Sequence, residues 1–242
     1  MLPRPEGYAV LRSVPSLRPG STDEPAEDVD EHWWAPDDID DRCVVLREPA
    51  SPQARGFRLL RHRLLAESDP HIVSVTSAVG GEGKTTCAVN LALCMAEETF
   101  ASVLLLEANP CRPSLAQVFD LAALRNGPPA NTSKAAGAPV PQVYALPGTQ
   151  LRIATVSACA VRQGRLDRVL LDVAMRELRE TYEYVVIDTA SVLESADANI
   201  ACECADGVVV TARAAISRRS TLQRALDQLR PASVCGIVLL DA

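Results

Sequence analysis

The feature that most constrains the fold is a β-branched apolar segment that runs directly into a glycine-rich loop and then into an apolar helical segment. Residues His71–Ser77 form the predicted strand, Ala78–Gly83 the loop, and Lys84–Glu97 the predicted helix. Glycines allow backbone N–H groups to turn inward around an anion, and the helix N-terminus adds partial positive charge. The arrangement predicts a phosphate-binding loop; an ordinary glycine-rich turn is the alternative.

The loop follows the pattern G-x-x-x-x-G-K-S/T, except that Ala78 stands at the first glycine. In such loops the lysine reaches the β- and γ-phosphates, and the hydroxyl that follows it binds Mg²⁺. We therefore predict a catalytic role for Lys84 and a metal-binding role for Thr85. Lys84 is one of only two lysines among 24 basic residues, which supports a specific need for lysine at this position. The predicted nucleotide-binding residues are Gly80, Gly81, Glu82, Gly83, Lys84, Thr85 and Thr86.

Two predicted strands end in an acidic residue. Glu107 follows the apolar run Leu104–Leu106, and Asp188 follows the run Tyr184–Ile187. Ligands bind at the carboxyl ends of the strands in open α/β sheets, and a buried acid is costly unless it meets a cation or a hydrogen-bond donor. We therefore predict that Glu107 and Asp188 are catalytic and bind Mg²⁺ together with Thr85. A capping role at a strand-to-loop turn is the alternative for Glu107.

The remaining apolar runs alternate between strand and helix patterns. This alternation predicts an α/β domain over residues 46–242, with a mostly parallel sheet flanked by helices. Residues 126–147 are rich in Pro, Gly and Ala and are predicted to form a surface loop. The further predicted strands are 103–108, 151–156, 184–189, 207–213 and 235–240, and the further predicted helices are 51–66, 166–181 and 217–229.

The excess negative charge lies at the N-terminus. Residues 1–42 hold eleven acids and four arginines, whereas the rest of the chain holds twenty acids and twenty bases. Abundant Pro, Asp and Glu predict a disordered acidic tail over residues 1–45. Within it, Trp33-Trp34 either docks into a partner or folds back onto the protein's own surface.

Charge and hydropathy also exclude several classes of function. A neutral body with an acidic tail argues against nucleic-acid binding, which rewards basic patches. No apolar run approaches the ~18 residues that span a bilayer, so we expect a cytoplasmic protein with no direct membrane insertion. The eight scattered cysteines include no C-x-x-C pair, and we predict neither a zinc site nor a disulfide framework.

These motifs together resemble the bacterial tyrosine kinase (BY-kinase) family, a branch of the MinD/ParA-type P-loop ATPases. Residues 76–86 resemble the family's Walker A motif, Glu107–Pro113 its second acidic motif, and Tyr184–Thr189 its Walker B strand. Residues 51–61 resemble the helix that the family uses to form ring oligomers. Val79 stands where MinD and ParA proteins carry their signature lysine, which favours the kinase branch.

The resemblance implies a protein that binds ATP and Mg²⁺ and regulates the biosynthesis and export of capsule or exopolysaccharide. It also implies a homo-oligomer and recruitment to the inner membrane by a partner, a membrane polysaccharide co-polymerase that acts as adaptor. The choice of ATP over GTP follows from the resemblance alone, because Leu240 stands where the family usually ends its last strand in asparagine.

The sequence departs from the family at positions that matter for phosphoryl transfer. The chain ends at Ala242 without the C-terminal tyrosine cluster that accepts phosphate in the family. We therefore expect a degenerate, nucleotide-binding regulator with reduced or lost autokinase activity. The alternatives are an active kinase that phosphorylates a partner in trans and a MinD/ParA-like ATPase switch. The substitutions are Glu107 and Asn109 for two aspartates, Cys111 for an arginine, Ala190-Ser191 for two prolines, and Arg55 for a glutamate.

Overall fold

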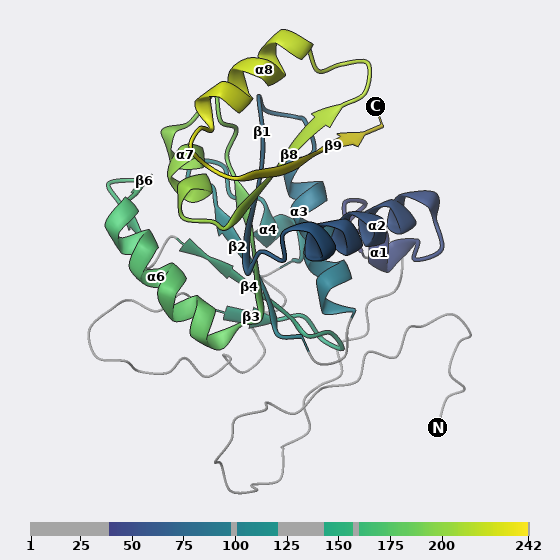
Figure 1. The fold of residues 1–242 in the computed structure, drawn as a ribbon. Helices are drawn as coiled ribbons and strands as arrows, with labels where there is room; N and C mark the ends of the chain where they lie inside the picture. Colours follow the sequence, from purple (N-terminus) through teal and green to yellow (C-terminus); the bar gives the residue numbers. More distant parts are fainter. Residues whose placement is uncertain (1–38, 98–100, 121–142, 157–159, 242) are drawn as a thin grey trace, which may run out of the picture.

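A computed structural model describes residues 39–97, 101–120, 143–156 and 160–241 of the 242-residue chain. Seven strands form one sheet in the order β3-β4-β2-β7-β1-β8-β9, in which every neighbouring pair is parallel except β3 and β4 (Figure 1). The predicted α/β class with a mostly parallel sheet is confirmed. The sheet strands are β1 (Ile72–Ser77), β2 (Val103–Ala108), β3 (Val143–Ala145), β4 (Leu151–Thr155), β7 (Tyr184–Thr189), β8 (Gly207–Arg213) and β9 (Val234–Leu240).

Helices cover both faces of the sheet, as a parallel sheet requires. One face packs against α1 (Val44–Arg47), α2 (Pro52–Glu67) and α3 (Lys84–Ala96) in a single apolar cluster. The opposite face packs against α6 (Arg168–Thr181), α7 (Ala196–Glu203) and α8 (Arg219–Gln228) in two further clusters. Both faces of β1 and β2 are therefore buried, which explains why these strands read as continuous apolar runs. The short helix α4 (Leu115–Val118) follows β2.

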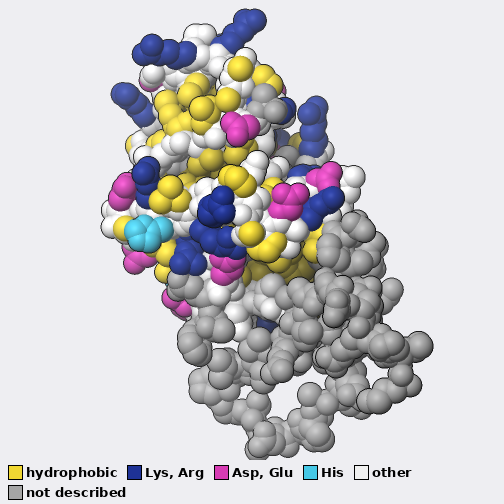
Figure 2. All heavy atoms as spheres, turned by 90° about the vertical axis from the view of Figure 1, so that its right-hand side faces the viewer, with side chains coloured by type: hydrophobic (Ala, Val, Ile, Leu, Met, Phe, Trp, Pro, Cys, Tyr) yellow, Lys and Arg dark blue, Asp and Glu magenta, His cyan; other side chains and the backbone are white. Residues whose placement is uncertain are grey.

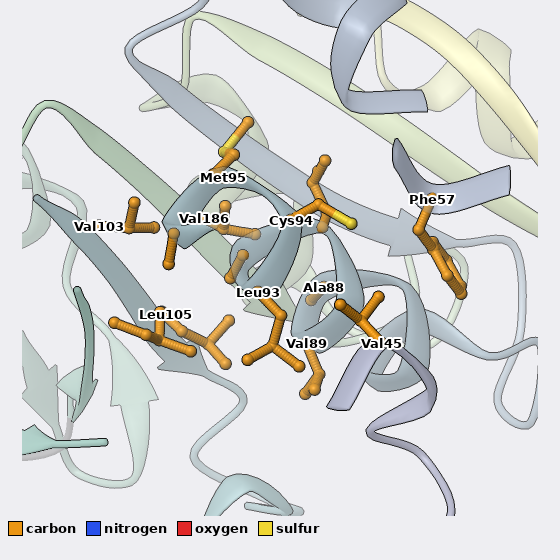
Figure 3. Packing of buried hydrophobic residues seen from close by; sticks show 14 of the residues in the cluster. Val45, Phe57, Ala88, Val89, Leu93, Cys94, Met95, Val103, Leu105 and Val186 are labelled. Atoms are coloured by element: carbon orange, nitrogen blue, oxygen red, sulfur yellow. The ribbon is translucent and has the colours of Figure 1, made fainter. Parts of the chain in front are cut away.

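Helix α3 lies at the centre of the larger cluster. Ten of its 13 residues are buried, because the sheet covers one side of it and the layer of α1 and α2 covers the other. Figure 3 shows Val103 and Leu105 of β2 on the sheet side of this helix, and Val45 and Phe57 on the opposite side. The helix that begins directly after the glycine-rich loop is thus held rigidly in the core.

The folded part of the chain extends further toward the N-terminus than the predicted boundary between residues 45 and 46. Cys43 and Val45 are buried against α3, and Asn90 of α3 binds the backbone on both sides of Cys43. Its side-chain oxygen accepts from Val45 N at 2.9 Å, and its Nδ2 donates to the Arg42 carbonyl. Residues 39–45 therefore belong to the folded body, because their few apolar side chains complete the layer over α3. Residues 1–38, with Trp33-Trp34, lie outside the described residues.

Three further elements differ from the predictions. Val143–Ala145, assigned to a surface loop, forms the antiparallel edge strand β3 beside β4. Leu166 belongs to a small hairpin, β5 (Val161–Arg162) and β6 (Arg165–Leu166), and α6 begins two residues later. This shift occurs because the Asp167 side chain accepts from Val169 N and Leu170 N and so caps the helix. Helix α7 was not predicted from its eight-residue sequence.

The opposite edge of the sheet, strand β9, is partly open to solvent. Ile237 and Leu239 of β9 are exposed. Figure 2 shows hydrophobic side chains gathered on the side of the molecule where β9 lies. An open groove of about 520 Å³ separates β9 from α8. None of the helices in the described ranges is long and apolar enough to cross a membrane.

Candidate nucleotide and magnesium site

The glycine-rich loop joins the carboxyl end of β1 to the first turn of α3. Gly81 and Gly83 both have φ of 81°, in the left-handed region that favours glycine. Gly83 is the N-cap of α3, so no side chain caps the first N–H groups of the helix. These donors, with the partial positive charge of the helix N-terminus, remain available to an anion. Gly80 is exposed and faces the Glu194 carboxylate, which lies 3.3 Å from the position of a built Cβ.

Glu82 holds the loop in place from inside. Its side chain is buried, and one carboxylate oxygen accepts from Val79 N at 3.0 Å. The other oxygen accepts from the Ser217 hydroxyl, whose oxygen in turn accepts from Arg213 N at 2.8 Å. Glu82 was predicted to bind nucleotide, but the structure directs its side chain to the loop backbone and to the segment between β8 and α8.

Lys84 extends from the start of α3 toward the segment that follows β7. Its Nζ donates to Ser191 Oγ at 3.0 Å. Burial lowers the pKa of the Lys84 ammonium, and the nearby carboxylates of Asp188, Glu194 and Glu82 act in the opposite direction. Ser191 is itself buried, so the ammonium has one fixed neutral partner and several acidic neighbours. Such an ammonium is suited to neutralise a phosphate group.

Thr85 and Asp188 form a direct hydrogen bond across the floor of the site. Thr85 Oγ1 donates to Asp188 Oδ2 at 2.8 Å and also lies 3.2 Å from Ser114 Oγ. The other oxygen of Asp188 is buried without a partner among the described residues. Burial raises the pKa of Asp188 to about 7; the Thr85 hydrogen bond lowers it, and the charge of Glu107 raises it further. Thr86, the last predicted residue of the loop, is half-buried, and its carbonyl accepts from Asn90 Nδ2 at 2.7 Å.

Glu107 lies directly beside Asp188, because parallel strands β2 and β7 pair these two residues in register. Its Oε1 accepts from the backbone N–H groups of Ser114 and Leu115, where α4 begins. Its Oε2 is buried and has no partner among the described residues. Burial raises the pKa of Glu107 against the opposing effect of these hydrogen bonds. One oxygen thus has the capping role considered from the sequence, while the other remains available.

The donor set fits a magnesium ion. Two buried, unpartnered carboxylate oxygens come from adjacent strand ends, and the Thr85 hydroxyl lies beside them. Mg²⁺ prefers oxygen ligands, and it is usually bound by one or two carboxylates while phosphate oxygens and water complete its coordination. The described residues contain no group of three or more His, Cys, Asp or Glu able to hold a metal alone. The fit is therefore to a metal that arrives with a phosphate ligand.

Sequence reasoning did not identify four polar residues of this site: Ser114, Ser191, Glu194 and Ser217. Ser191 was noted only as a replacement for proline, and its contact with Lys84 supplies a reason for a hydroxyl there. Glu194 and Ser217 lie on loops after β7 and β8, where no motif marks them. The only available signal was position, because both follow strands whose carboxyl ends meet at the edge of the sheet that carries the loop.

The sheet order and the loop define the fold of the chain. The chain has the fold of MinD/ParA-type P-loop NTPases: it matches the septum site-determining protein MinD of Pyrococcus horikoshii, solved with Mg-ADP, at a TM-score of 0.52. The identity to that protein is 20%, covering 70% of this chain and 69% of the other. No protein-family model matches the chain.

Within that class, the tyrosine kinase domains are structurally more similar to the chain. The chimeric protein CapA2B2 matches at a TM-score of 0.65 and 19% identity, covering 84% of this chain and 91% of the other. The kinase domain of the Escherichia coli tyrosine kinase ETK matches at 0.63 and 20% identity, covering 82% and 79%. The resemblance predicted from the motifs is thereby confirmed: the chain has the fold of bacterial tyrosine kinase domains.

One curated protein is similar to the chain in sequence. The succinoglycan biosynthesis transport protein ExoP of Rhizobium meliloti (strain 1021) is 28% identical over 176 residues. The match covers 69% of this chain and 22% of ExoP, so the chain spans about a fifth of the length of this curated relative.

Proposed function

We propose that this chain binds ATP with Mg²⁺ and acts as a kinase-like regulator of exopolysaccharide biosynthesis and export, with reduced or lost autokinase activity. The pair of unpartnered buried oxygens on Glu107 and Asp188, beside Thr85, is the observation that carries the proposal. Buried carboxylates without partners are costly, and a bound metal would remove that cost. The similarity to ExoP supports the biological setting.

Every predicted site residue except Thr86 has a role in this proposal. The N–H groups of Gly80, Gly81 and Gly83 would surround the phosphates, and Lys84 would neutralise them. Thr85, Glu107 and Asp188 would hold the metal. When bound, Mg²⁺ supplies positive charge to the phosphate oxygens. Glu82 would act indirectly, because its carboxylate holds Val79 of the loop and Ser217 of the segment between β8 and α8 together.

The hydrogen bonds of Glu107 support the loss of autokinase activity. Oε1 holds Ser114 N and Leu115 N, so only Oε2 is open. If Oε2 binds the metal, the side chain has no oxygen left to take a proton from an acceptor hydroxyl. The proposed partner is a membrane polysaccharide co-polymerase that acts as adaptor. The chain would signal that it has bound nucleotide through its contact with that partner.

Calorimetric titration with ATP and ADP, with and without Mg²⁺, tests the proposal. We expect micromolar binding that requires Mg²⁺ for full strength. Lys84→Ala should weaken it ~10- to 100-fold, because a charge-assisted hydrogen bond contributes about 1.5–3 kcal/mol. Arg224→Ala, which removes an exposed cation on α8, is the matched control and should leave the affinity unchanged. If the natural chain bound neither nucleotide, the proposal would be rejected.

A further inference from the structure

The hairpin of β5 and β6 places two arginines directly opposite each other. Its two-residue turn has positive φ at both positions, 51° at Gln163 and 76° at Gly164, as in a type I′ turn. Arg162 and Arg165 flank the turn and pair in register across the hairpin. Directly opposed like charges destabilise an antiparallel pair, so this tip is electrostatically unfavourable on its own.

The protein compensates these two charges weakly. Arg162 Nε lies 3.5 Å from Asp167 Oδ2, and Arg165 Nε lies 4.0 Å from Asp197 Oδ1. The Arg162 side chain is 70% exposed and the Arg165 side chain is 69% exposed. Within the described ranges, no hydrogen bond from the terminal nitrogens of either guanidinium is present. By contrast, Arg179 binds both oxygens of Asp206, at 2.9 and 2.5 Å.

Two contacts with other segments fix the hairpin, which itself follows β4, at the carboxyl edge of the sheet. Asp167 N donates to the Ala160 carbonyl at 2.8 Å and closes the base of the hairpin. Leu166 N donates to Asp197 Oδ1 at 3.2 Å, in the first turn of α7 after β7. The Cys111 thiol lies 4.0 Å from the Gly164 carbonyl, in the segment after β2. Strands β4, β2 and β7 are neighbours, so the hairpin flanks the strand ends that carry Glu107 and Asp188 (Figure 1).

A third arginine extends this basic edge. Arg112 is exposed and follows Cys111, which contacts the hairpin turn. Its side chain has no acidic partner among the described residues. Its charge acts on Lys84, where it contributes to the lowered pKa of that ammonium. Arg112, Arg162 and Arg165 thus lie on the side of the nucleotide site that α8 and β9 do not cover.

We propose that Arg112, Arg162 and Arg165 form a docking surface for an acidic polypeptide segment of a partner protein, held beside the bound nucleotide. Arginine matches carboxylates through its planar fork of donors, and the weak internal ion pairs leave that fork available. Nucleic acids and anionic membranes reward larger clusters, of about 6–10 phosphate contacts or 4–8 basic residues. Three arginines on a rigid hairpin and the adjoining turn suit a short acidic segment better. This inference rests on the proposed function in one respect only, namely that a nucleotide is bound beside the acidic segment.

Fluorescence anisotropy of the full chain with a labelled random copolymer of glutamate and tyrosine tests the surface. Arg162→Gln/Arg165→Gln should weaken copolymer binding about five- to tenfold, because exposed charge pairs contribute up to about 1 kcal/mol each. Arg224→Gln/Arg230→Gln removes the same charge from α8 and from the turn that follows it, on the other flank, and should change binding less than about twofold. Raising the salt concentration should weaken binding of the natural chain. The hairpin variant should fold at least as stably as the natural chain, since the opposed charges are gone.

Parallel calorimetry with ATP separates the two proposals. Unchanged ATP affinity in the hairpin variant, with reduced copolymer binding, is the expected result. Equal copolymer binding by the natural chain and the hairpin variant would overturn the proposed docking surface, whether or not the ATP affinity changes. A hairpin-dependent loss of binding to DNA or to phosphatidylglycerol vesicles, with no copolymer binding, would overturn the choice of a polypeptide. Copolymer binding that depends on the hairpin, in a chain that binds no ATP, would reject only the nucleotide function.

Discussion

Glu107 and Asp188 face each other across β2 and β7, and each residue has only 2% of its surface exposed. The desolvation of two neighbouring carboxylates favours their protonated forms, which is why both pKa values are raised. In a purely structural core, apolar side chains of similar size would avoid this cost. The two buried carboxylates therefore lower the stability of the folded protein, and a bound cation would reverse this loss.

The pH dependence of stability follows from Asp188. Its pKa in the folded protein, about 7, lies above the value of about 3.9 expected in the unfolded chain. Between these values the folded state holds more protons, so stability is lost as the pH rises from about 4 to 7. The loss is roughly 1.4 kcal/mol for each pH unit in this window. Urea denaturation of metal-free protein at pH 5 and 7.5 would measure it.

Asp188→Asn should flatten this dependence, since the amide does not titrate. A smaller slope should remain, because the raised pKa of Glu107 acts in the same direction. Glu67→Gln on the exposed surface of α2 removes an acid without touching the site, and the slope should persist in it. An Asp188→Asn variant with the same slope as the natural chain would contradict the assignment.

The individual site residues were only partly predictable from the sequence. Lys84 and Thr85 belong to a local motif, and Asp188 ends a strongly apolar strand, so local sequence was sufficient to select them. Ser191 and Ser114 reach the site through contacts separated by 107 and 29 residues from their partners Lys84 and Thr85. Serines are common in loops, and nothing local distinguishes these two. The role of Glu82 depends on Ser217, which is equally remote.

At the scale of elements, the loop between β1 and α3 touches the last strand of the sheet. A Cβ built on Gly83 would lie 2.3 Å from Leu240 Cδ1, whereas a Cβ on Gly81 meets nothing within 4 Å. Both glycines have φ of 81°. Gly81→Ala therefore incurs only the backbone cost of the left-handed region, about 1–2 kcal/mol. Gly83→Ala incurs this cost and must also displace Leu240.

We expect Gly83→Ala to weaken ATP binding more than Gly81→Ala does, as measured by calorimetry. Adding Leu240→Ala should recover the extra loss in the Gly83→Ala background and leave the effect of Gly81→Ala unchanged. The reason is that a methyl group added at Gly83 would meet Leu240, whereas one added at Gly81 would not. Equal recovery in both backgrounds would show that the difference does not come from this contact.

Elements buried on both faces were the most predictable. Strands β2, β7 and β8 have the predicted bounds, because long apolar runs with sharp ends have few other solutions in a parallel sheet. Strand β3 has three residues and half-exposed side chains, so its pairing with β4 determines it more than its sequence does. The start of α6 depends on the Asp167 cap, which a hydrophobic pattern does not register.

At the scale of the whole molecule, the acidic N-terminal segment and the neutral body meet at residues 39–47. Composition placed residues 39–45 in the tail, because acids and proline dominate the sequence up to about Asp41. The structure places Cys43 and Val45 in the core instead, where Asn90 secures the backbone around them. The apolar run Cys43–Leu46 is too short to form a periodic pattern, so only the tertiary contacts reveal the boundary.

Two N-terminal deletions test this boundary. Removing residues 1–38 leaves in place every contact that the structure describes for Cys43, Val45 and Asn90, so we expect stability toward urea and ATP affinity to match the full chain. Removing residues 1–47 exposes apolar surface of α3 and leaves Asn90 without two partners, which should cost at least about 3 kcal/mol. Asn90→Ala in the full chain should lose about 1–3 kcal/mol by the same mechanism. The shorter deletion removes Trp33-Trp34 and should weaken adaptor binding alone; a loss of ATP affinity in it would show that the tail contributes to the nucleotide site.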